Sequence, residues 1–95
     1  MLEDIKPALR VSTDDPGITS EIQDLIDACR LDLIQSGVST VKANDEDDAL
    51  IKRAITVYCK ANFGYDNPDA DRFNDSYIML KQHLSLAGDY RESME

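Results

Sequence analysis

The stretch DDALIKRAITVYCKANFG, residues 47–64, decides the fold. Its apolar residues recur at three- and four-residue spacing, which places side chains on one face of an α-helix. That face comprises Leu50, Ile51, Ala54, Ile55, Tyr58, Cys59 and Asn62, with Lys52, Arg53, Thr56 and Lys60 mostly opposite. Because the face is wide, the sequence predicts a central helix from about Asp47 to Phe63, ended by Gly64 and contacted by both neighbouring helices.

The acidic run before this helix, residues 44–48, superficially resembles a cation site. It lacks the alternating ligand spacing and the glycine of a calcium loop. An acidic side chain just before a helix instead accepts hydrogen bonds from the first backbone N–H groups and complements the helix dipole. We therefore expect this run to cap the central helix.

The preceding segment predicts a second helix, with the core-facing stripe Ile22, Leu25, Ile26, Cys29 and Leu33. Its start has two alternatives, Pro16 at the first helical position or Thr19 as the cap. Gly37 is suited to the left-handed conformation that ends a helix. Residues 38–45 form a connector in which β-branched side chains favour extended structure, so we expect a projecting loop or ribbon.

The last helix is predicted to open at Asn67 and Pro68, to carry the stripe Phe73, Tyr77, Leu80 and Leu84, and to stop at Gly88. A short first helix is predicted around Ile5, capped by Asp4, with Pro7 in its first turn and a turn over residues 14–17 after it. The aromatic residues Tyr58, Phe63, Tyr65 and Phe73 are expected to form a core plug where the last two helices meet. The predicted fold is all-α, a small bundle of three main helices plus a short N-terminal helix. Residues 1–88 form the helical domain, and residues 89–95 form a C-terminal tail that is flexible in the free subunit.

Composition narrows the function classes. The chain has 95 residues, enough for one domain, and 19 acidic residues against 10 basic ones give a net charge of −9. Scattered Lys and Arg disfavour tight nucleic-acid binding, and net acidity disfavours anionic membranes. No signal core or membrane-spanning apolar run is present. The two cysteines, Cys29 and Cys59, lack metal-ligand or redox spacing, so we expect buried, reduced thiols.

A search for catalytic chemistry finds no convincing constellation. His83, the only histidine, lies near the end of the predicted last helix, where it suits the helix dipole. The glycines sit singly at element boundaries and form no phosphate loop. Ser76 follows Asp75 in a motif that resembles that of acyl carrier proteins, but it falls about two turns inside a predicted helix. We predict no enzyme, no cofactor and no metal site.

One family resemblance covers almost the whole chain in order. Residues 51–55, residues 58–64 and residues 66–68 are similar to the signature of the small bacteriophage head–tail connector family, also called DNA-packaging adaptor proteins. Leu2–Lys6, Ile22–Leu33, Phe73–Leu84 and Leu86–Tyr90 resemble the flanking elements of that family. The turn over residues 14–17 departs from the family because it is longer than the usual acidic link.

The resemblance implies a structural subunit that forms a ring of about a dozen copies beneath the portal protein. Such a ring extends the DNA channel, lets DNA pass without sequence-specific binding, and presents a platform to a tail-completion or stopper protein. It implies a place at the head–tail junction of the virion, after assembly in the host bacterial cytoplasm. Within this framework we expect the interface residues Val38, Thr40, Val41 and Lys42 in the connector and Tyr90 and Arg91 in the tail. The alternative is an acidic helical regulatory protein that binds a partner by imitating DNA.

Overall fold

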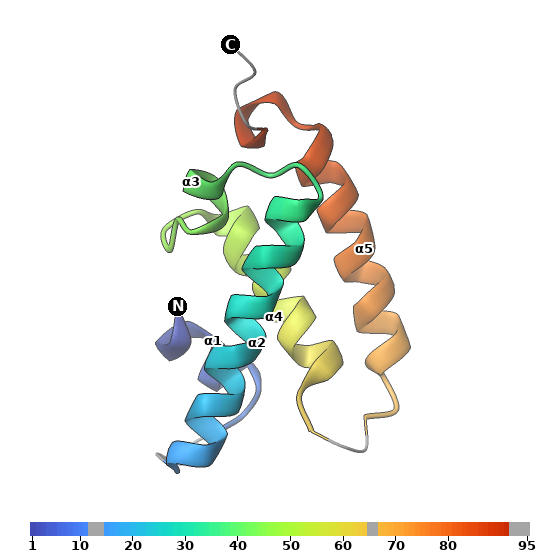
Figure 1. The fold of residues 1–95 in the computed structure, drawn as a ribbon. Coiled ribbons are helices and arrows are strands. Elements are labelled where there is room, and N and C mark those ends of the chain that lie inside the picture. Colours follow the sequence, from blue (N-terminus) through green and yellow to red (C-terminus); the bar gives the residue numbers. More distant parts are fainter. Residues whose placement is uncertain (12–14, 65–66, 92–95) are drawn as a thin grey trace.

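The computed structural model describes residues 1–11, 15–64 and 67–91, and the helices in them are arranged around one core. In chain order they are α1 (Leu2–Ala8), α2 (Pro16–Gln35), α3 (Thr40–Ala43), α4 (Ala49–Asn62), α5 (Ala70–Leu86) and the short 3₁₀ helix η1 (Gly88–Tyr90). Within these ranges the only β-type pairing is an isolated antiparallel bridge between Val38 and Arg91. The all-α prediction is confirmed. Three long helices and a short N-terminal helix are present, together with two short helical turns that the sequence did not predict (Figure 1).

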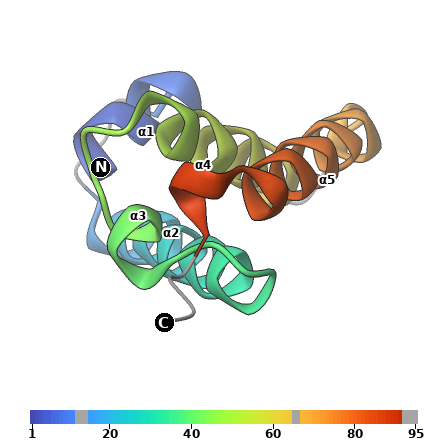
Figure 2. The same ribbon diagram turned by 90° about the horizontal axis from the view of Figure 1, so that it is seen from above.

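Helix α4 is central, as its wide apolar face predicts, and it contacts α1, α2 and α5. The two ribbon views agree that α2 and α5 lie on different sides of α4 (Figures 1 and 2). The predicted face is wrong at its edges, because Leu50 is 40% exposed and Asn62 is exposed, whereas Val57 is buried. Helix α5 packs beside the flank that carries Val57, so that flank is covered although the periodicity favours its neighbours.

The acidic run caps α4, as expected. The Asp48 carboxylate accepts hydrogen bonds from the backbone N–H groups of Leu50 (3.0 Å) and Ile51 (3.1 Å). These two donors have no partner inside the helix, so the cap satisfies them. The helix ends at Asn62, and Gly64 then takes a positive φ of 87°, which a residue with a side chain rarely adopts.

Helix α2 resolves the two alternatives for its start. Pro16 occupies the first helical position, and the Asp15 side chain caps the helix by accepting a hydrogen bond from the backbone N–H of Gly17 (2.8 Å). The predicted stripe faces the core, where Ile22, Ile26, Cys29 and Leu33 are fully buried. The predicted stop is also confirmed, because Gly37 has a φ of 112°.

The prediction of a loop or ribbon after α2 is wrong over Thr40–Ala43, which are helical, although Val38 forms an isolated β-bridge with Arg91. Ser39 caps a single helical turn, α3, by accepting a hydrogen bond from the backbone N–H of Lys42 (3.1 Å). Val38 is 1% exposed and belongs to the core, while Val41 on the helical turn is 81% exposed. A hydroxyl cap and the burial of Val38 outweigh the weak preference of β-branched residues for strands.

Two predicted helix starts also need correction. The Asn67 side chain accepts a hydrogen bond from the backbone N–H of Asp69 (3.1 Å) and closes a turn, so α5 begins only at Ala70. In α1 the N-cap is Met1 rather than Asp4, and Pro7 lies near the end of the helix rather than in its first turn. Of the predicted turn over residues 14–17, Asp15 is the N-cap of α2, and Pro16 and Gly17 belong to its first turn. Asp14 and the aromatic residue Tyr65 lie outside the described residues.

Candidate functional site

The two predicted interface segments meet at one end of the molecule. The backbone N–H of Ser39 donates to the carbonyl oxygen of Tyr90 (2.6 Å), next to the bridge between Val38 and Arg91. Figure 1 shows α3 and the chain after α5 side by side at the upper end. Residues 40–42 and 90–91 therefore form one surface, which we call the α3–tail surface. Val38 contributes no exposed area to it, because its side chain is buried in the core.

Three side chains fix the α3–tail surface to the body of the protein. The Tyr90 hydroxyl donates to both Asp48 carboxylate oxygens (3.0 and 2.9 Å). The Lys42 ammonium lies 3.8 Å from Asp48 Oδ2 and 5.2 Å from the centre of the Tyr90 ring. One carboxylate thus caps α4 and also holds both segments. Sequence reasoning found the capping role of the acidic run but not this second role, because Tyr90 is 42 residues away.

Electrostatics stabilises this arrangement. Burial opposes ionisation of Asp48, but hydrogen bonds from the Ile51 backbone, Tyr90 and the Leu50 backbone, together with the Lys42 charge, outweigh it and lower the pKa of the carboxyl below 3.8. Burial first, and then the hydrogen bond to Asp48, raise the pKa of Tyr90 above 10.0. At neutral pH the carboxylate is therefore charged and the phenol protonated, as their hydrogen bond requires.

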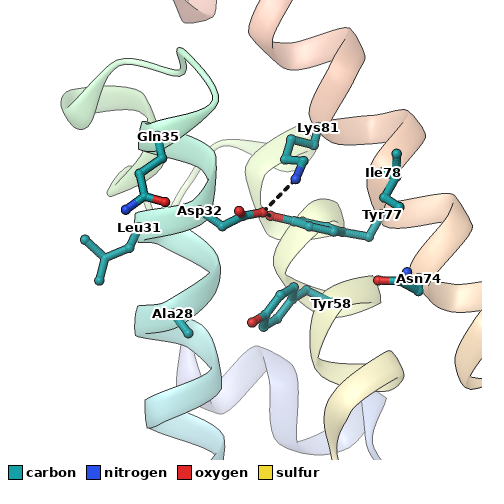
Figure 3. Close-up of a pocket in the computed structure, with 9 residues that line it drawn as sticks. All are labelled: Ala28, Leu31, Asp32, Gln35, Tyr58, Asn74, Tyr77, Ile78 and Lys81. Atoms are coloured by element: carbon teal, nitrogen blue, oxygen red, sulfur yellow. Dashed lines mark hydrogen bonds and ion pairs between the residues drawn. The ribbon is translucent and has the colours of Figure 1, made fainter.

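A groove of about 470 Å³ lies between α2 and α5, with α4 behind it in the view of Figure 3. It is lined by Ala28, Leu31, Asp32, Gln35, Tyr58, Asn74, Tyr77, Ile78 and Lys81. At its centre Asp32 Oδ2 accepts hydrogen bonds from the Tyr77 hydroxyl (2.6 Å) and the Lys81 ammonium (3.0 Å). The Tyr77 ring meets the Tyr58 ring edge-on at 5.0 Å between centres. We call the residues Asp32, Tyr77 and Lys81 the Asp32 network.

The Asp32 network joins the two outer helices. Burial opposes ionisation of Asp32, but the hydrogen bonds from Tyr77 and Lys81 lower its pKa below 3.8. Burial and then the hydrogen bond to Asp32 raise the pKa of Tyr77 well above its usual 10.0. With Asp32 charged and Tyr77 protonated at neutral pH, the network acts as a tether rather than as a proton-transfer pair.

A second groove, of about 380 Å³, lies between α4 and α5 and is lined by Arg53, Val57, Ser76, Met79, Leu80 and His83. His83 is exposed in the last turn of α5, and Ser76 is half-buried within that helix rather than at its start. Within the described residues no three His, Cys, Asp or Glu side chains are placed to hold a metal ion together. Over the same residues no helix has the length and apolar character needed to cross a bilayer. The sequence revealed neither groove, because both form between helices.

Both cysteines are free and buried. Burial is the main cause that raises the pKa of Cys29 and of Cys59 from 9.0 to about 12. A thiol with so high a pKa is protonated and a poor nucleophile at neutral pH. The predicted burial of these thiols is confirmed.

The fold is a small helical bundle, and a comparison with protein families defines the class of protein. The family model described as "Phage connector protein" matches residues 1–91. The chain therefore belongs to the phage connector protein family, as the resemblance in its sequence implies, and it has a head–tail connector role. Neither the comparison with curated proteins nor that with solved structures gave a match. The family favours a structural component of the virion over an enzyme or an acidic DNA mimic.

Proposed function

We propose that this protein is a ring subunit that binds below the portal, extends the DNA channel and provides the platform for a tail-completion or stopper protein. The observation that carries the proposal is the family match over residues 1–91, which includes every helix of the structure. The protein contributes a rigid helical body to the ring, measuring 45 × 25 × 19 Å. Its core is centred on the helix that carries the connector signature.

The charge of the chain suits a DNA channel. A net charge of −9 per subunit gives the assembled ring a strongly negative field. Because that field repels the phosphate backbone, DNA passes without adhering to the wall. The ring needs no base-specific contacts for this role, since the conduit treats all sequences alike.

The α3–tail surface is the candidate contact to the portal or to the neighbouring subunit. Thr40, Val41 and Arg91 are exposed there, and the Asp48 anchor holds the backbone that presents them. Pre-ordering reduces the entropy lost on binding, which favours association. An apolar side chain as exposed as Val41 gains from being covered.

The proposal is tested by mixing the purified protein with the portal protein of the same phage and imaging the complex by electron microscopy. We expect a ring of this protein coaxial with the portal and a lengthened channel. The mass of the complex, measured by native mass spectrometry, gives the number of copies. A portal that stays bare at saturating protein concentration contradicts the proposal.

A further inference from the structure

The exposed surface of α2 is acidic around one apolar side chain. Asp24, Asp27 and Leu31 lie at helical spacing on the exposed side of the helix, and Leu31, which is 60% exposed, also lines the groove between α2 and α5. The Gln23 amide donates to Asp27 Oδ1 (3.0 Å) and steadies that carboxylate. We call Asp24, Asp27 and Leu31 the acidic face.

The groove between α4 and α5 has the opposite character. Arg53 of α4 lines this groove and no acidic side chain among the described residues does, although the chain as a whole has a charge of −9. The ionisable side chains that line the groove are Arg53 and His83, and the apolar ones include Met79, which is 70% exposed. We call this lining the basic groove.

The two surfaces point in different directions on one subunit. Ile51 and Ile55 are fully buried in the core, whereas Arg53, two residues from each of them, is exposed and lines the basic groove. Positions two residues apart on a helix differ by about 200° in direction, so the groove opens away from the core side of α4. The acidic face lies on α2, and no residue of α2 lines the basic groove. One subunit can therefore use both surfaces at once, each with a different neighbour.

We propose that the basic groove of one copy receives the acidic face of a second copy, with Leu31 against Met79 and the carboxylates of Asp24 and Asp27 beside Arg53 and His83. The inference rests on the proposed ring and names the contact that closes it. A contact between two different surfaces is head-to-tail, and it generates a closed ring when the rotation between neighbours closes. Charge complementarity selects this pairing, because two acidic faces or two basic grooves repel each other.

Charge reversal tests the contact. Asp24→Lys with Asp27→Lys makes the acidic face basic, and Arg53→Glu with His83→Glu makes the groove acidic; all four side chains are exposed. Each double variant alone places like charges in every contact, so we expect loss of ring formation on the portal. In a 1:1 mixture the two double variants can alternate around the ring, and every contact then pairs opposite charges. We therefore expect rings to form again. The control matched to the acidic-face variant, Asp71→Lys with Asp75→Lys, makes the same change of net charge as that variant on exposed residues outside the groove lining and should assemble like the wild type.

Far-UV circular dichroism first establishes that each variant is folded, and electron microscopy with native mass spectrometry then counts rings. If the wild type forms rings and either folded double variant alone also forms them, the proposed contact is wrong, while the proposed function stands. Failure of the mixture to recover rings also overturns it, and is the result expected if the portal rather than a second copy occupies the groove. Absence of wild-type rings on the portal overturns both proposals.

Discussion

Removing the Tyr77 hydroxyl tests whether the Asp32 network stabilises the bundle. Tyr77→Phe keeps the ring, which is 3% exposed and packs edge-on against Tyr58, and deletes the 2.6 Å hydrogen bond to Asp32. A hydrogen bond to a charged group contributes about 1.5–3 kcal/mol. The Asp32 side chain is 37% exposed and retains Lys81, so water partly replaces the lost donor. We therefore expect the free energy of unfolding to fall by about 1–2 kcal/mol.

Urea denaturation followed by far-UV circular dichroism measures this loss, with Tyr77→Phe repeated in an Asp32→Asn background as the control. If the charged acceptor provides the stabilisation, the second measurement gives a smaller loss, because the neutral amide accepts a weaker hydrogen bond. A loss below about 0.5 kcal/mol, typical of surface substitutions, refutes the reasoning. An equal loss in both backgrounds would show that the charge of Asp32 does not contribute to the effect of the hydroxyl.

The pH dependence follows from the direction of the shift. The folded pKa of Asp32 lies below its ordinary 3.8, so the network's contribution is present above about pH 4 and is lost as the pH falls through the folded pKa. The difference between wild type and Tyr77→Phe should therefore shrink in acid. A difference that stays constant as the pH is lowered through this range contradicts the assignment to an ionised carboxylate.

Three further predictions concern other parts of the molecule. Asp48→Ala removes the α4 cap and the Tyr90 anchor together, so we expect the free energy of unfolding in urea to fall by about 1–2 kcal/mol. Substitution of the exposed neighbour, Asp47→Ala, should change it by less than about 0.5 kcal/mol. Equal effects of the two substitutions would show that the cap contributes nothing. Cys29 and Cys59, with pKa values of about 12, should react with a thiol reagent only at the rate of unfolding, and rapid labelling of the native protein would contradict their burial. Because the thiols of the unfolded chain ionise above a pH of about 9, whereas the buried thiols stay protonated, the contribution of the buried thiols to stability is lost as the pH rises from about 9 to 12. Val41→Asp should leave the free energy of unfolding within about 0.5 kcal/mol and weaken assembly on the portal, and unchanged ring counts would exclude Val41 from the interface.

Local sequence signals predicted most of the fold, because capping and helix-stop residues act within a few positions of themselves. Asp48 and Gly37 are such cases, and both were found in the predicted roles. The wide face of α4 did not reveal which flank α5 covers, so Val57 was missed and Leu50 was wrongly placed inside. That choice depends on how two helices pack, which residue spacing within one helix does not encode.

The candidate site was less predictable for the same reason. The acidic residue at position 32 looks like any other in the sequence, and only the fold brings it to Tyr77, 45 residues away. Exposed apolar side chains such as Met79 lie at helical spacing and resemble core positions until the neighbouring helix is placed. The order of the elements identified the class of protein, but the Asp32 network and the two grooves could be recognised only from contacts between residues distant in the sequence.

Salt separates the two electrostatic effects that act on assembly. Each subunit carries a net charge of −9, and repulsion between whole subunits acts over their dimensions of 19 to 45 Å. The Debye length is about 10 Å at 0.1 M salt and about 3 Å at 1 M, so moderate salt screens this repulsion before it screens paired charges in contact. If Arg53 pairs with carboxylates of a neighbour, ring formation should rise from low salt to about 0.1 M and fall again toward 1 M. Counting rings on the portal across that range tests the balance. A steady rise with salt would show that apolar contacts alone hold the ring, and a steady fall would show that the net charge does not oppose it.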